Sequence, residues 1–225
     1  MSKLLALDTS SDACSVALWN EGELVEDFQL LPRQHAQAIL PQIKQLLSQA
    51  GLTLKQLDAV AFGRGPGSFT GLRIAAATAQ GLALAQDLPV LPISTLQALA
   101  LAAQQQYYSR KILTLLDARM DEVYWCAWQG QEDGPVALMD EALSQPESVL
   151  PPAQDDQDWL LVGSGACYRE RLSPLLQSQL QQVIPDLYPS AGALVQLAQA
   201  AWARGEALDA AEGQPIYLRD QVTHS

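Results

Sequence analysis

The residues with the clearest potential for chemistry lie in the stretch FGRGPGSFTGLR, from Phe62 to Arg73. Glycine-rich loops before a helix often bind phosphate, because glycine lets a ligand approach the backbone and a helix N-terminus attracts anions. A P-loop is excluded, since Gly67 and Gly71 are one residue too close and Leu72-Arg73 replaces the required Lys-Ser/Thr. The GxGxxG fingerprint of dinucleotide-binding proteins is also absent from this stretch. The loop alone therefore favours a structural turn over a phosphate site.

Aspartates at the ends of two apolar segments are the second candidates. KLLALDTSSDACSVALW resembles KILTLLDARMDEVYWCAW at an offset of 109 residues, which aligns Asp8 with Asp117 and Asp12 with Asp121. A carboxylate at a strand tip can hold Mg²⁺ through water, and turn hydrogen bonding is the alternative. The first tip lacks a glycine to wrap phosphate and Glu122 at the second would repel ATP, so we favour turn chemistry. The alignment itself indicates a duplicated unit.

The histidines and cysteines do not suggest a metal site. His35 begins a helical pattern and His224 lies one residue from the C-terminus. We interpret His35 as a helix-start surface residue, with a partner contact as the alternative. The three cysteines have no metal-type spacing, and Cys126 alternates with Tyr124 and Trp128 as packing residues do. We therefore expect no metal and no cofactor.

Composition narrows the class of protein. Thirteen basic against 25 acidic residues give a net charge of −12, which argues against direct nucleic-acid binding. The apolar runs are too short to span a membrane, and the N-terminus is too short for a signal peptide. Three cysteines fit a reduced, cytoplasmic protein.

Hydrophobic periodicity predicts an α/β protein with the order βββαβαβα at its start. Helices are expected over His35–Ala50, Leu72–Gln86 and from Ser94 to about Ala103, the last with a capping box. The pattern then restarts, and 144–158 reads as an exposed loop. Two tandem βββαβα lobes describe the actin-like ATPase (ribonuclease H-like) architecture. We place the lobes at residues 1–105 and 106–225, with the second reduced and its last segment able to return to the first.

The expected helix Leu72–Gln86 carries small residues in rows. The two rows are Ala77, Gly81, Ala85 and Ala75, Ala79, Ala83. Glycine inside a helix costs about 1 kcal/mol relative to alanine, so Gly81 needs a reason. Such rows let another backbone come close, either within this chain or on another protein.

Five segments together resemble the TsaB (YeaZ) family. They are LALDTSSDACSVAL, RQHAQAILPQI, GRGPGSFTGLRIAAATAQGLA, PISTLQALA and PIYLRD. The resemblance implies a non-catalytic scaffold in bacterial synthesis of N6-threonylcarbamoyladenosine at position 37 of ANN-decoding tRNAs. The implied partners are TsaD, the catalytic paralogue, and TsaE, an ATPase, with a homodimer when TsaD is absent. In TsaD-like proteins a histidine motif binds metal where Thr95 and Leu99 stand here, and neither side chain replaces histidine as a ligand.

The resemblance also implies where partners bind. The expected partner or dimer interface consists of His35, Ile39, Ile43, Ala75, Ala77, Thr78, Gly81, Leu82 and Ala85. A nucleotide is expected near the glycine loop at Gly65, Gly67, Ser68 and Arg73. Two alternatives remain: an independent actin-like kinase or ATPase that uses Asp8 and Asp117 with Mg²⁺, and a peptidase. The peptidase lacks both a metal site and an activated nucleophile in this sequence.

Overall fold

The computed structural model describes residues 2–152 and 158–219. Its internal contacts divide the chain into two compact units, residues 1–98 with 189–216 and residues 99–188 with 217–225. This division falls after Ala98 and assigns residues 189–216 to the first unit, whereas the sequence places the boundary after residue 105. Among the described helices, none is both long and apolar enough to cross a membrane.

The first unit is built on a five-stranded mixed sheet in the order β3-β2-β1-β4-β5. Its strands are β1 (Lys3–Asp8), β2 (Ala13–Asn20), β3 (Glu23–Leu30), β4 (Ala59–Gly65) and β5 (Val90–Ser94). The first three strands form an antiparallel meander, whose β2–β3 turn is Glu21-Gly22 with both residues at positive φ. β4 pairs parallel to β1, and β5 pairs parallel to β4.

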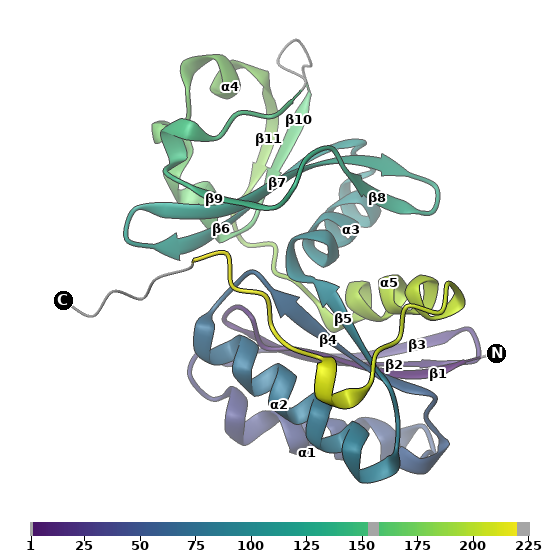
Figure 1. The fold of residues 1–225 in the computed structure, drawn as a ribbon. Coiled ribbons are helices and arrows are strands. Elements are labelled where there is room, and N and C mark those ends of the chain that lie inside the picture. Colours follow the sequence, from purple (N-terminus) through teal and green to yellow (C-terminus); the bar gives the residue numbers. More distant parts are fainter. Residues whose placement is uncertain (1, 153–157, 220–225) are drawn as a thin grey trace. The chain divides into compact units, whose positions relative to one another are not determined.

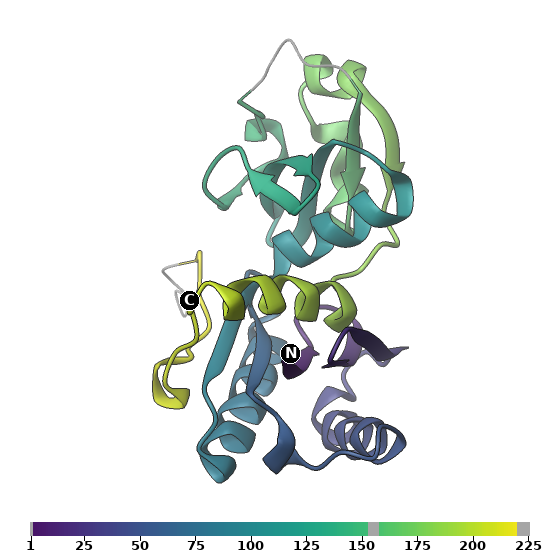
Figure 2. The ribbon, with the colours of Figure 1, turned by 90° about the vertical axis from the view of Figure 1, so that its right-hand side faces the viewer.

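Helices cover both faces of this sheet. α1 (His35–Gln49) and α2 (Phe69–Gln86) lie on one face, and α5 (Ala191–Ala203) lies on the other (Figures 1 and 2). A short 3₁₀ turn, η1 (Leu54–Gln56), precedes β4, and η4 (Ala210–Glu212) packs on α2. The alternation of the strands places Leu5 and Leu7 against α1 and α2, in one core with Ile39, Ile43 and Phe62.

The second unit begins within α3 (Thr95–Tyr107) and contains the second sheet, in the order β11-β10-β6-β7-β8 with β9 beside β7. Its strands are β6 (Lys111–Arg119), β7 (Glu122–Gln131), β8 (Gly134–Ala137), β9 (Ala142–Ser144), β10 (Trp159–Val162) and β11 (Leu180–Ile184). Its short helical segments are η2 (Pro146–Ser148), η3 (Ser164–Arg171) and α4 (Pro174–Gln179).

The two sheets repeat one topology, which confirms the predicted actin-like fold. β6, β7 and β8 form the antiparallel meander that β1, β2 and β3 form, and β10 and β11 follow in parallel as β4 and β5 do. The second copy is reduced, because β9 and η2 stand where the first has the 15-residue helix α1.

The segment 144–158 differs from the sequence-based expectation of an exposed loop, because Pro146 and Val149 are buried. Residues 153–157 of that segment, Asp220 of the PIYLRD motif and His224 lie outside the described residues.

Candidate functional site

The glycine loop packs against the β1–β2 turn of its own unit. A Cβ added to Gly71 would overlap the carbonyl oxygen of Thr9, and one added to Gly67 would lie 2.7 Å from that of Ser10. The Ser68 amide donates to the Ser10 carbonyl oxygen at 2.7 Å, and the Thr9 hydroxyl donates to the Gly71 carbonyl oxygen at 2.7 Å. The close approach that these glycines allow is therefore made by the chain itself.

The other side of the loop is covered by the segment that follows η4. Gly65 adopts a φ of +109°, and a Cβ there would lie 2.8 Å from the Ile216 carbonyl oxygen. The Ile216 amide donates to the Arg64 carbonyl oxygen at 2.8 Å. The loop is thus held between two other segments of the first unit, which accounts for its glycines without a phosphate.

The residues expected near a nucleotide take structural roles in this loop. The Ser68 hydroxyl caps α2 by accepting from the Gly71 amide at 3.4 Å, and this cap starts the helix three residues before the predicted Leu72. The exposed Arg73 guanidinium stacks on the Phe69 ring, 3.8 Å from its centroid. A nucleotide at Gly65, Gly67, Ser68 and Arg73 stays a prediction.

Asp8 lies at the end of β1 with only 1% of its surface exposed. Its Oδ1 accepts from the Ser10 amide at 2.9 Å and from the Ser10 hydroxyl at 2.7 Å. Its Oδ2 is directed at the α-carbon of Gly63, where a Cβ would overlap it. Neither Asp8 Oδ2 nor the buried Thr95 Oγ1 has a hydrogen-bond partner within the described part of the chain.

Burial raises the pKa of Asp8 to about 6, against the lowering effect of the two Ser10 hydrogen bonds. A carboxylate in this position faces backbone rather than solvent, so it is poorly placed to hold a hydrated Mg²⁺ ion. Asp8 instead fixes the turn that supports the glycine loop.

Asp117, its counterpart in the second unit, is satisfied by its own turn. Asp117 Oδ1 accepts from the Arg119 amide at 2.8 Å and from the Tyr168 hydroxyl at 3.3 Å. Asp117 Oδ2 accepts from Arg119 Nη1 at 3.1 Å. The Asp117 amide donates to the Ser164 hydroxyl at 3.1 Å. These contacts match the turn chemistry favoured from the sequence.

The start of α3 has the expected cap, since the Gln97 amide donates to Ser94 Oγ at 3.0 Å. Thr95 and Leu99, at the positions of the metal-binding histidines in TsaD-like proteins, are both fully buried. Across residues 2–152 and 158–219 no three His, Cys, Asp or Glu side chains gather in a way that could hold a metal ion.

His35 starts α1 beside the β1–β2 turn and is half-buried. Burial lowers the pKa of its imidazole, while the nearby Asp12 carboxylate and a hydrogen bond with the Ser11 backbone oppose this shift. At neutral pH the ring is therefore neutral. We assign it a structural contact with the turn, and a contact with a partner stays a prediction.

The residues expected at the partner interface separate into two groups. Ile39, Ile43 and Ala75 are buried in the core between the helices and the sheet, so they support the surface rather than form it. Ala77, Gly81 and Ala85 are exposed along one stripe of α2, and Thr78 and Leu82 are partly exposed beside them. The row Ala75, Ala79 and Ala83 is fully buried and packs within the unit.

Gly81 packs against no other element among residues 2–152 and 158–219. A Cβ at this position would meet no other atom within 4 Å. Three large apolar side chains on α1 and α2 are also exposed: Leu40 at 54%, Phe69 at 45% and Leu84 at 64%. We call Leu40, Phe69, Ala77, Gly81, Leu84 and Ala85 together the α1–α2 surface.

Sequence reasoning did not identify Leu40, Phe69 and Leu84 as site residues. Leu40 precedes Pro41, outside the core stripe of α1, and Leu84 lies on the exposed side of α2. These residues could have been found from the sequence as large apolar side chains that lie outside the core-facing stripe of their helix.

Comparisons with known proteins place the chain in a family. Residues 29–224 match the family model TsaD: tRNA N6-adenosine threonylcarbamoyltransferase. The tRNA threonylcarbamoyladenosine biosynthesis protein TsaB of Escherichia coli (strain K12) is 39% identical, with 98% of this chain and 96% of that protein covered. The protein of the same name from Haemophilus influenzae is 39% identical, with 98% and 94% covered.

A solved structure agrees with these sequence matches. YeaZ from Pseudomonas aeruginosa is 44% identical, covers 97% of this chain and 100% of that chain, and superposes with a TM-score of 0.92. The matched sequences and structure span nearly the whole chain, including both units, and confirm the resemblance found in the sequence. The chain therefore belongs to the TsaB (YeaZ) family of TsaD-like proteins.

Proposed function

We propose that this chain is a non-catalytic subunit of the bacterial machinery that forms N6-threonylcarbamoyladenosine in tRNA. Its task is to bind and activate the TsaD-type threonylcarbamoyltransferase, in an assembly that includes the ATPase TsaE. The names of relatives that match it over nearly their full length support the pathway. The α1–α2 surface is the proposed contact with TsaD, and the same surface would pair two copies when TsaD is absent.

One observation carries the docking proposal. Gly81 lies inside the 18-residue helix α2, where glycine costs about 1 kcal/mol relative to alanine, yet no described residue outside its own helix backbone occupies the space beside it. Ala77 and Ala85, one turn away on either side, are exposed and equally small. A partner backbone that packs along this stripe explains all three residues, and the adjacent Leu40 and Leu84 supply apolar area for it.

The catalytic alternatives receive less support from the residues. A kinase that acts through Asp8 needs this carboxylate to reach a hydrated metal, whereas it is buried against Gly63. A peptidase needs an activated nucleophile. Burial raises the pKa of Cys14 to about 11 and that of Cys126 to about 12, which keeps both thiols protonated.

The docking proposal is tested by Gly81→Leu. The side chain projects into open space in the isolated chain, so the thermal midpoint should equal or exceed that of wild type. Affinity for the TsaD-type subunit should fall at least about tenfold, because an added isobutyl group overpacks the contact. Ala203→Leu, on an exposed position of α5, is the matched control and should bind as wild type does. Wild-type affinity in Gly81→Leu would refute the assigned surface.

A further inference from the structure

A surface pocket of about 480 Å³ lies beside the α1–α2 surface, within the first unit. Its walls are six apolar and two polar residues: Leu40, Ile43, Leu47, Leu52, Leu54, Leu82, Lys44 and Ser48. A small-molecule site usually has several polar groups that converge to orient the ligand, whereas here only an ammonium and a hydroxyl are available. An apolar pocket of this kind suits an anchoring side chain of another protein.

The charge around this pocket differs from that of the rest of the chain. Residues 31–86, which include α1 and α2, contain five basic residues and one acidic residue, Asp58. The remainder contains 8 basic and 24 acidic residues. The carboxylate of Asp58 already accepts from the Lys3 amide at 2.7 Å. The segment 31–86 of an acidic protein thus has a net charge of +4, and it includes both helices of the proposed docking surface.

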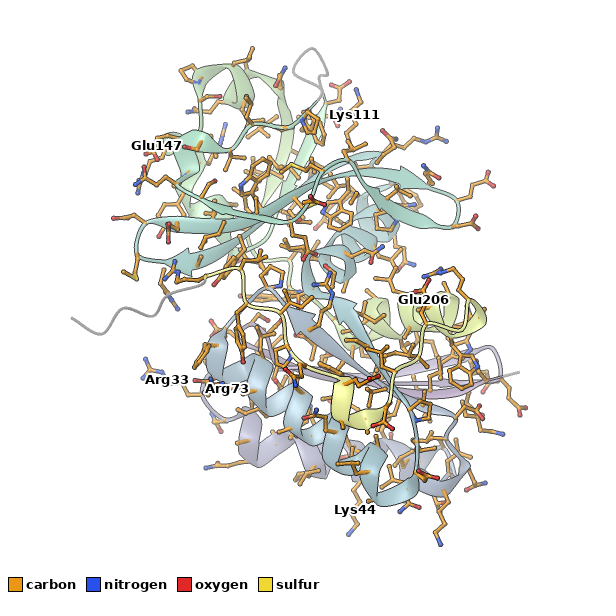
Figure 3. All side chains as sticks on the ribbon, viewed as in Figure 1. Arg33, Lys44, Arg73, Lys111, Glu147 and Glu206 are labelled. Carbon is orange, nitrogen blue, oxygen red and sulfur yellow. The ribbon has the colours of Figure 1, made fainter. Side chains whose placement is uncertain are left out.

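The lysines and arginines of the described residues differ in whether they form an ion pair. Lys3, Arg119, Arg171, Arg204 and Arg219 each form an ion pair with a carboxylate. Lys44, at the pocket, and Arg33, before α1, form none with any described residue. Figure 3 shows Arg33, Lys44 and Arg73 on the side of the first unit that carries α1 and α2.

The charge pattern separates two possible occupants. A second copy would bring the same cations to the contact, and neither α1 nor α2 contains an acidic residue to meet them. A different protein can supply carboxylates, and the opposite charges then favour the correct pair over the self-pair. A nucleic acid would also supply negative charge, but an apolar pocket offers nothing to a phosphate backbone.

We propose that the pocket receives one bulky apolar side chain of the partner subunit, and that a partner carboxylate next to this side chain pairs with Lys44. The inference rests on the proposed function, because it takes the partner to bind along α1 and α2. The apolar anchor gives the contact its affinity, and the carboxylate distinguishes the partner from a second copy of this chain.

Two variants test the pocket while Gly81→Leu tests the surface. Ser48→Trp fills the pocket from its exposed rim, and Lys44→Glu reverses its charge. Arg169→Glu, exposed on η3 of the second unit, makes the same change in net charge and is the control. Affinity for the TsaD-type subunit is measured by calorimetry at low and high salt, with sedimentation to follow self-association.

We expect Ser48→Trp and Lys44→Glu each to weaken partner binding about tenfold or more, and the Lys44→Glu loss to shrink at high salt. Arg169→Glu should bind as wild type does. If Gly81→Leu abolishes binding while both pocket variants bind normally, the pocket inference fails and the docking proposal stands. If Gly81→Leu also binds normally, both fail.

Two further results would overturn the choice of occupant. Tighter self-association of Lys44→Glu, with unchanged affinity for the partner, would assign the pocket to a second copy. Binding of unmodified tRNA by the isolated chain, lost in Lys44→Glu, would assign the basic region to RNA.

Discussion

Replacing Asp8 by asparagine should stabilise this protein at neutral pH, although it removes a charged residue from the turn that supports the glycine loop. Burial raises the pKa of Asp8 from 3.8 to about 6 in the folded state. Asparagine is isosteric and keeps an oxygen for the Ser10 amide and hydroxyl. Its amide group would occupy the position of Oδ2 beside Gly63, and Thr95 Oγ1, which lacks a partner among the described residues, also lies beside Gly63.

The magnitude follows from linkage. A shift of about two pKa units corresponds to about 3 kcal/mol, and the carboxyl is fully buried, so solvent does not screen this effect. The folded state binds the proton more tightly than the unfolded state. This group therefore imposes almost no penalty at pH 4 and below, and its penalty grows between about pH 4 and 6, where the unfolded state has released the proton and the folded state has not. Above pH 7 the ionised carboxylate reduces the free energy of unfolding by the full amount.

The assay is urea unfolding of wild type and Asp8→Asn at several pH values from 4 to 8. Coincident transitions in tryptophan fluorescence and circular dichroism establish that a two-state analysis holds. The difference in free energy of unfolding should be near zero at pH 4 and reach about 2–3 kcal/mol in favour of Asp8→Asn at pH 8. Asp12→Asn, exposed on the same turn, is the matched control for loss of a carboxylate.

A pH-independent difference between wild type and Asp8→Asn would refute this reasoning. So would a variant less stable than wild type at pH 8, because that result would mean that the Asp8 carboxylate has a favourable partner when ionised. A carbon-13 titration of the Asp8 carboxyl group provides an independent check, with an expected midpoint near 6.

Two further substitutions test how the first unit is held together. Gly71→Ala places a methyl group against the Thr9 carbonyl oxygen, so we expect a loss of at least about 2 kcal/mol in denaturant unfolding, and a variant as stable as wild type would contradict the packing of the loop on the turn. Glu26→Ala removes the oxygen that accepts from the Gly192 amide at the start of α5, and a loss of about 1–2 kcal/mol is expected, with most of it recovered in Glu26→Gln. Equal losses in both Glu26 variants would indicate that the charge, not the hydrogen bond, holds α5.

The secondary structure could be predicted because its signals are local. The 3.6-residue period of α1 is set by which face of the helix is buried, and the apolar run of β2 reflects burial of both of its faces, so each signal lies within one element. The duplicated sheet was predictable for the same reason, because two copies of one strand–turn–strand pattern lie at a fixed offset. The predicted cap at Ser94 located the start of α3, whereas α2 was predicted to begin at Leu72, three residues after its actual start behind the Ser68 cap.

The long-range arrangement could not be predicted from such patterns. α5 follows β11 in sequence but packs on the first sheet, where the Ala191 amide donates to Ser15 Oγ and the Gly192 amide to Glu26. Nothing in the Ala-rich sequence of α5 specifies which sheet it covers. In the same way, the glycines of the loop indicated a close approach but did not identify its partner, which is the β1–β2 turn.

The candidate site was predicted in part, for a physical reason. The resemblance indicated which two helices bind a partner but not which of their faces, so Ile39, Ile43 and Ala75 were included although they belong to the core. The proposed docking surface consists of residues outside the buried stripes of the helices, such as Leu40 and Leu84. Their exposure becomes visible only when the orientation of each helix on the sheet is known.

The most direct test of the central claim is reconstitution of the modification reaction. TsaD-type and TsaE-type subunits, threonylcarbamoyl-adenylate synthase, ATP, bicarbonate, threonine and unmodified tRNA are combined, and modified adenosine is measured without this chain, with wild type, and with Gly81→Leu. We predict modification only with wild type, and no modification or ATP hydrolysis by the isolated chain. Modification at the same rate without the chain, or with Gly81→Leu in its place, would contradict its role as a docking activator.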